Sequence, residues 1–165
     1  MKIHAMQDIS DRFRTQCAHL PIEKICITQN CKLTENEVKA FNIATYYINL
    51  EISESPLPAI INQIIVLFLC NDHITFSLDD PFVLGTHMEV CILPLFLWRK
   101  YNLDLRASMF TTIEELCHGL WKIPDGEPIQ KRVESILKRI DPTLAYANMY
   151  NHIRQLVLNR SKFTT

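Results

Sequence analysis

The chain contains very little glycine: Gly85, Gly119 and Gly126 are its 3 glycines in 165 residues. Proteins typically contain about 7% glycine. Phosphate-binding loops and dinucleotide-binding turns need several closely spaced glycines, because a Cβ would hold the backbone away from the phosphate. The sequence therefore excludes P-loop, kinase and Rossmann nucleotide sites. It also lacks a G-x-S-x-G motif, which excludes the usual serine hydrolase site.

Long apolar runs and a paired-cysteine framework are also missing. The most apolar stretch, residues 59–70, contains two amides and is shorter than the roughly 20 residues of a membrane helix. Residues 1–15 show no signal-peptide pattern. The cysteines are scattered at positions 17, 26, 31, 70, 91 and 117, which is typical of buried free thiols in a reducing compartment. We therefore expect a cytoplasmic protein without a membrane segment.

Length and composition indicate one domain. A chain of 165 residues that is 48% hydrophobic and 21% charged can bury one core of ordinary size. No internal repeat, low-complexity tract or long linker divides it. We expect a single globular domain over residues 1–165, with a frayed tail after about residue 160.

Hydrophobic periodicity predicts an α+β fold, as a helix-rich single domain with a small sheet. Apolar residues recur with helical spacing in residues 3–20, 34–49, 108–121, 128–140 and from 142 toward 160. Period-two alternation and β-branched residues predict strands at residues 22–28 and 74–78. Thr34 and Glu37 have the spacing of a capping box at a helix start.

Two apolar stretches leave alternatives open. Residues 59–70 fit a buried helix or a buried strand, and we favour the helix because of the length of the run. Residues 88–101 contain Pro94, so they form either a kinked helix or a strand that leads into a helix beginning near Pro94.

Residues 109–122 carry the clearest chemical pattern. On a helical wheel Glu114, Glu115 and His118 share a narrow polar face. The opposite, apolar face consists of Met109, Ile113, Leu116, Cys117 and Leu120. Because the polar residues are spaced i, i+3 and i, i+4, their head groups can converge on one point, as a helical metal site requires.

Glu114-Glu115-Leu116-Cys117-His118 resembles the zinc-peptidase motif H-E-x-x-H, with Glu114 at the position of the first histidine. The resemblance is to small zincin-like metallopeptidase domains and covers at most residues 74–137. It implies zinc as the cofactor, Glu114 and His118 as ligands, and Glu115 as the catalytic general base. It also implies a further ligand from the segment after the motif helix, either Asp125 or Glu134.

The resemblance implies hydrolysis of a peptide by a metal-activated water. A carboxylate in place of a neutral imidazole lowers the charge that polarises this water. The expected function is therefore that of a zincin-like domain with a degenerate or inactive metal-dependent peptidase site.

Other patterns offer weaker metal sites. His73 and His87 flank the strand expected at residues 74–78 and could supply a distant ligand. Cys26 and Cys31 could hold zinc, but structural zinc sites usually have a second close pair of ligands. A ferritin-like di-iron site needs a second E-x-x-H motif, which the sequence lacks. An ordinary solvated helix face explains the same polar residues.

The distribution of charge bears on the partner. Residues 122–165 carry 8 basic and 4 acidic side chains, whereas residues 1–121 carry 9 basic and 14 acidic ones. A nucleic-acid partner is not expected, because no aromatic-basic stripe or DNA-binding motif accompanies this charge. The alternative function is a non-catalytic helical interaction or regulatory module, which uses an apolar groove or the basic C-terminal helices. Under both hypotheses the partner is a protein or peptide.

Overall fold

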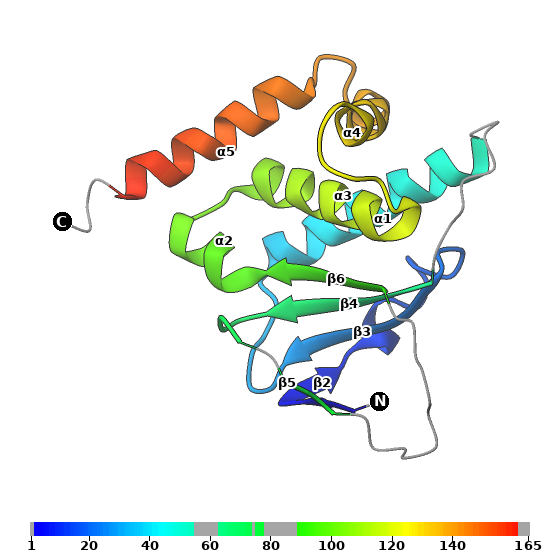
Figure 1. Ribbon diagram of the computed structural model, residues 1–165, viewed down its shortest axis with the longest axis vertical. Coiled ribbons are helices and arrows are strands. Elements are labelled where there is room, and N and C mark those ends of the chain that lie inside the picture. Colours follow the sequence, from blue (N-terminus) through cyan, green and yellow to red (C-terminus); the bar gives the residue numbers. More distant parts are fainter. Residues whose placement is uncertain (1, 55–62, 74, 78–88, 162–165) are drawn as a thin grey trace.

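The computed structural model of the chain describes residues 2–54, 63–73, 75–77 and 89–161. These residues form a helix-rich α+β domain, which confirms the expected fold class (Figure 1). In chain order the elements are β1 (Lys2–His4), β2 (Met6–Asp8), the 3₁₀ helix η1 (Ser10–Phe13), β3 (Ile22–Thr28), α1 (Glu35–Glu54), β4 (Ile64–Leu69), β5 (Thr75–Ser77), β6 (Glu89–Pro94), α2 (Leu95–Tyr101), α3 (Leu105–Trp121), α4 (Glu127–Ile140) and α5 (Tyr146–Ser161).

The main sheet is mixed and has the strand order β2-β3-β4-β6. Strands β3, β4 and β6 are parallel, while β2 is antiparallel to β3. Helix α1 makes the crossover between β3 and β4, as parallel neighbours require. Strands β1 and β5 pair separately as an antiparallel two-stranded sheet. In Figure 1 helices α1 and α3 lie together over one face of the main sheet.

The central strand β4 corrects one prediction. We favoured a helix over residues 59–70, but residues 64–69 form a strand, and residues 59–62 lie outside the described part. All six side chains of β4 are buried, and alternate ones belong to two separate clusters. A central parallel strand is covered on both faces and therefore has no polar alternation. This is why its sequence is indistinguishable in period from a buried helix.

The helix predicted over residues 3–20 is also wrong. Ala5, between β1 and β2, has a positive φ of 56°, which is incompatible with a right-handed helix. Residues Met6 to Asp8 then pair with β3, and Ser10 accepts a hydrogen bond from the Ile25 amide at 2.9 Å. Pairing with a neighbouring strand outweighed the helical spacing of apolar residues in this segment.

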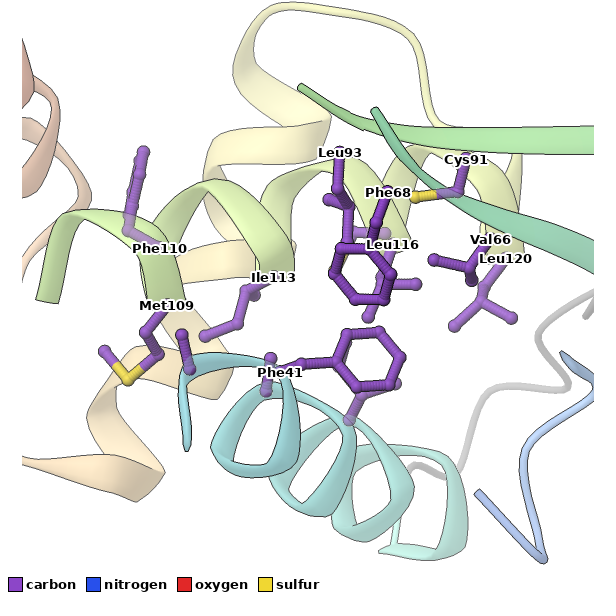
Figure 2. Packing of buried hydrophobic residues seen from close by; sticks show 14 of the residues in the cluster. Phe41, Val66, Phe68, Cys91, Leu93, Met109, Phe110, Ile113, Leu116 and Leu120 are labelled. Carbon is purple, nitrogen blue, oxygen red and sulfur yellow. The ribbon is translucent and has the colours of Figure 1, made fainter. Parts of the chain in front are cut away.

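The principal core lies between the sheet and the α1–α3 layer (Figure 2). The Phe41 ring contacts the Phe13 and Phe68 rings edge-on, with centroid distances of 4.9 and 5.2 Å. Gly119 brings α3 close to the strands, since a Cβ there would lie 3.5 Å from Ile64 and 3.7 Å from Cys91. Truncation to alanine of a large aromatic side chain buried in this way costs about 3–5 kcal/mol.

Several element boundaries follow the predicted signals. Thr34 and Glu37 form the predicted capping box: the Thr34 amide donates to the Glu37 carboxylate at 2.7 Å, and the Glu37 amide donates to Thr34 Oγ1 at 3.3 Å. Pro94 ends β6 and α2 begins at the next residue, which confirms the strand-to-helix alternative. Gly126, with a φ of 108°, starts α4. The tail beyond residue 161 lies outside the described residues.

Candidate functional site

Helix α3 presents the candidate site residues as its sequence predicts. Its apolar residues, including Ile113, Leu116 and Leu120, are fully buried against the sheet and α1. Glu114, Glu115 and His118 lie on the opposite side, where they are exposed or half-buried. The helix ends at Trp121 because Lys122 takes a left-handed conformation with φ 51° and ψ 36°. The chain then turns back over the last helical turn.

This turn fixes the imidazole of His118. Its Nδ1 lies 2.6 Å from the carbonyl oxygen of Ile123. A carbonyl can only accept a hydrogen bond, so Nδ1 carries the proton and donates it. In the neutral ring Nε2 then carries the lone pair, in the imidazolium it carries a second proton, and it lies 3.5 Å from Oδ1 of Asp125. The turn thus brings together His118 and Asp125, two of the predicted metal ligands.

Glu114 lies in a different environment. The hydroxyl of Tyr146, at the start of α5, donates a hydrogen bond to its carboxylate. Burial raises the pKa of Tyr146 well above its usual value, and the acceptor Glu114 adds to the rise. The Tyr146 ring also packs against Phe110, with centroids 5.2 Å apart. The structure therefore directs the residue at the first ligand position toward α5.

Glu115 is the predicted general base. Burial raises its pKa above the usual value; the neighbouring His118 opposes this rise, and the carboxylates of Glu114 and Asp125 add to it. Because the residue keeps an exposed surface, solvent screening limits the size of the shift. A carboxylate with a raised pKa accepts a proton near neutral pH more readily than an ordinary one.

The other proposed ligands lie elsewhere. Glu134 pairs with Lys138 at 2.7 Å. His73 follows the carboxyl end of β4 and contacts Asp72, and His87 lies outside the described residues. Cys26 is buried on the sheet face that points away from α1 and α3, and Cys31 has another partner. Within the described ranges, no three His, Cys, Asp or Glu side chains are grouped closely enough to hold a metal ion.

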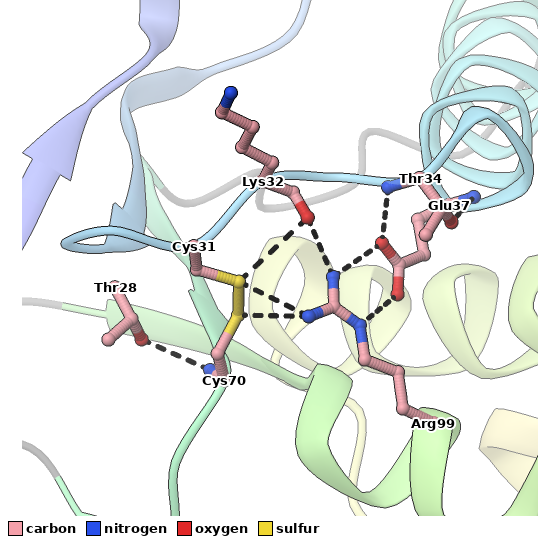
Figure 3. Close-up of polar contacts among 7 residues, drawn as sticks. All are labelled: Thr28, Cys31, Lys32, Thr34, Glu37, Cys70 and Arg99. Atoms are coloured by element: carbon pink, nitrogen blue, oxygen red, sulfur yellow. Dashed lines mark hydrogen bonds and ion pairs between the residues drawn. A yellow bond between two sulfur atoms is a disulfide. The ribbon is translucent and has the colours of Figure 1, made fainter.

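The cysteines require a correction. We expected free thiols, but Cys31 and Cys70 form a disulfide (Figure 3). The thiols of Cys17, Cys26, Cys91 and Cys117 are free. The sequence carries one signal for this pair: Cys31 closely follows the strand predicted at residues 22–28, and Cys70 ends the apolar run at residues 59–70. If these two segments were neighbouring parallel strands, both cysteines would lie at the same edge of the sheet. This pairing was not predicted, because the sequence analysis favours a helix for the second segment.

Comparisons with protein-family models, with curated proteins and with solved structures each found no match to this chain. Among the residues that the structure describes, no helix combines the length and the apolar character needed to cross a bilayer.

Proposed function

We propose that the chain is a zincin-like domain that binds a zinc ion through His118 and Asp125 and has a degenerate peptidase site. The distance of 3.5 Å between Nε2 of His118 and Oδ1 of Asp125 carries the proposal. It is longer than a good hydrogen bond. Two ligand atoms of a tetrahedral zinc ion, each about 2.0–2.1 Å from the metal, are about 3.3 Å apart.

The hydrogen bond of Nδ1 supports the same proposal. Metal-binding histidines usually donate their second ring N–H to a carbonyl or carboxylate, which fixes the tautomer and the direction of the free lone pair. Ile123 supplies such a carbonyl to His118. Imidazole and carboxylate ligands suit zinc better than they suit magnesium or calcium, which prefer all-oxygen sites.

The chemistry proposed for the site is limited. A bound zinc ion supplies Lewis acidity. Glu115 is the residue placed to accept a proton, since it follows Glu114 on the helix and its raised pKa favours proton transfer. Glu114 stands where a zincin has its first histidine, and it is held by Tyr146. With this position committed to α5, the domain binds metal but hydrolyses peptides poorly.

Elemental analysis and zinc titration test the proposal. Wild-type protein loaded with zinc and dialysed should retain a near-stoichiometric amount, and His118→Ala should lose it. His19→Ala is the control, because His19 is exposed in the segment between η1 and β3 and should not affect the metal. Zinc that fails to bind wild type, or that binds His118→Ala equally well, would refute the metal site.

A gain-of-function variant tests the ancestry separately. Glu114→His restores the H-E-x-x-H pattern and should tighten zinc binding by about tenfold or more, since it adds a neutral ligand four residues before His118. Thr111→His adds a histidine to the same helix but outside this spacing, and it should leave zinc affinity unchanged. Equal affinities in the two variants would argue against a zincin-like site.

The second candidate function is a non-catalytic interaction or regulatory module. The observation that favours it is the hydrogen bond from Tyr146 to Glu114, because it gives the polar face of α3 a structural task in holding α5. The variant Tyr146→Phe distinguishes the two functions. Under the zinc proposal the released Glu114 becomes available to the metal and zinc affinity rises, whereas under the module hypothesis only the attachment of α5 weakens.

A further inference from the structure

The disulfide lies at the carboxyl ends of two adjacent parallel strands. Cys70 is the residue after β4, and Cys31 lies in the loop that follows β3. Thr28 fixes both: its carbonyl accepts from the Cys31 amide at 3.1 Å, and its hydroxyl accepts from the Cys70 amide at 3.0 Å. In sheets of this kind the carboxyl ends of the strands are where binding and catalytic groups gather.

Arg99 of α2 faces both sulfur atoms. Its Nη1 lies 3.3 Å from Sγ of Cys31 and 3.6 Å from Sγ of Cys70 (Figure 3). The rest of the guanidinium is held in place by other groups. Nε and Nη2 donate to the two oxygens of Glu37 at 2.8 and 2.9 Å, and Nη2 also donates to the carbonyl of Lys32 at 2.8 Å.

This arrangement does not depend on the sulfur oxidation state. Burial alone would raise the pKa of Glu37, but hydrogen bonds from Arg99 and Thr34 hold it below its usual value. Glu37 therefore stays charged and keeps Arg99 beside the sulfurs. A disulfide is a poor hydrogen-bond acceptor, whereas a thiolate accepts strongly from a guanidinium. The contact is therefore worth more after the disulfide is reduced.

The disulfide is also accessible. Both cysteines are only half-buried. Cys31 lines a hollow of about 530 Å³ together with Arg12 and Lys32, and no carboxylate is among the described residues that line it. A thiol that bears negative charge is attracted to such a surface, while a cationic one is repelled.

We propose that Cys31 and Cys70 form a redox-active dithiol–disulfide site that exchanges with a small thiol bearing carboxylates, and that Arg99 is the positioning residue for the thiolate. The incoming thiolate attacks Sγ of Cys31 from the hollow and breaks the bond to Cys70, which leaves as a thiolate facing Arg99. A second thiol attacks the mixed disulfide and releases Cys31. Two thiols lose two electrons and become one disulfide, while Cys31 and Cys70 gain those electrons and two protons.

The first experiment tests reversible exchange. Folded protein is equilibrated with mixtures of reduced and oxidised glutathione, quenched in acid and labelled with a maleimide, and the free thiols are located by peptide mass spectrometry. Cys31 and Cys70 should appear together in one two-electron transition while the circular dichroism stays native. Cys17→Ser should leave this transition unchanged, and Cys31→Ser should abolish it. A pair that stays oxidised throughout, or opens only when the protein unfolds, would overturn the proposal.

The second experiment tests Arg99. In the Cys70→Ser variant, the rate at which iodoacetamide alkylates Cys31 should reach half of its maximum at a midpoint pH below about 8.5, the pKa of a typical free thiol. The charged groups near the sulfur include Arg99 of α2, Glu37 of α1 and Lys32 of the loop, and Arg12 lines the hollow beside Cys31. Adding Arg99→Gln should move this midpoint to higher pH. Adding Arg99→Lys instead should leave the midpoint close to that of the variant that keeps Arg99. If all three profiles coincide, Arg99 has only a structural role.

The third experiment tests the class of thiol. Glutathione, which is anionic, and cysteamine, which is cationic, are compared as reductants, each relative to its rate with a small uncharged disulfide. Glutathione should have a several-fold advantage at low ionic strength, and 1 M salt should remove it. The double variant Arg12→Glu, Lys32→Glu should reverse the order. Equal relative rates in wild-type protein would refute the preference for anionic thiols.

Discussion

The hydroxyl of Tyr146 joins the first turn of α5 to the outer side of α3 through its hydrogen bond to Glu114. We expect Tyr146→Phe to lower the free energy of unfolding by about 1–2 kcal/mol, because it removes a hydrogen bond to a charged, half-buried group and keeps the ring. Urea denaturation measures this loss. Tyr150→Phe is the control, since the Tyr150 ring stacks on Tyr146 but is more than half exposed. Equal losses in the two variants would contradict the structural role of the hydroxyl.

Glu37 gives the protein a predictable loss of stability in acid. Its pKa in the folded state lies below the unfolded value of about 4.3, so the stabilisation is complete above that pH and is lost as the pH falls through the folded pKa. At pH 7 we expect Glu37→Gln to cost about 1–3 kcal/mol, discounted because Arg99 is 38% exposed. The difference in the free energy of unfolding between Glu37→Gln and wild type, measured by thermal or urea unfolding, should decrease as the pH falls from 5 to 3. Glu35→Gln, an exposed neighbour, should show no such trend.

The sequence predicted part of the candidate site at the level of single side chains. The narrow polar face with Glu114, Glu115 and His118 follows from helical spacing alone, which is a local property. The partner of Glu114 does not, because Tyr146 lies 32 residues further along the chain. The same holds for the contact of Arg99 with Cys31, which spans 68 residues. Only the packing of helices and strands defines such neighbours.

Helix α4 is attached to α1 by a group of charges centred on Glu51. This carboxylate is 5% exposed and accepts hydrogen bonds from Arg132 and Arg139, both at 2.9 Å. Glu51→Gln should lower the free energy of unfolding by about 2–4 kcal/mol, because it leaves the mostly buried Arg132 without its counter-charge. Glu54→Gln, at a more exposed partner of Arg139, should cost much less. Amide exchange in α4 should accelerate only in the first variant, and equal rates in both would refute this attachment.

The predictability of the elements depends on whether their signals are local. The capping box depends only on Thr34 and Glu37, three residues apart, and is found where the sequence predicts it, while the strand-to-helix boundary at Pro94 is one of the two alternatives that the sequence leaves open. Strand β4 and the segment before β3 depend instead on neighbours in space. The all-apolar run of β4 is a strand because β3 and β6 pair with it on both sides. The spacing of apolar residues in the sequence does not indicate that pairing.

The proposed zinc and thiol sites lie at opposite ends of the sheet. Cys31 and Cys70 follow the carboxyl ends of β3 and β4. The turn after α3 lies at the other end, where Lys122 pairs with Glu89 at the start of β6 at a distance of 3.6 Å. The parallel strands β4 and β6 separate the two sites, and Figure 1 shows the end of α3 and the end of β4 on different sides of the domain. Sites that share no contacts should act independently.

This separation leads to a prediction for the complete domain. The disulfide closes a loop with a sequence separation of 39 residues that contains α1, so reduction should lower the free energy of unfolding by about 4 kcal/mol in the chain-entropy model. Domains typically have a free energy of unfolding of roughly 5–15 kcal/mol, and one in the upper part of that range remains folded after losing this amount.

Zinc affinity should be the same in oxidised and reduced protein, and His118→Ala should leave the glutathione transition of Cys31 and Cys70 unchanged. Calorimetric zinc titrations in the two redox states, together with thiol labelling of His118→Ala, measure both effects. A change of more than about threefold in either constant would mean that the two ends of the sheet are coupled, because independent sites agree within roughly 0.5 kcal/mol.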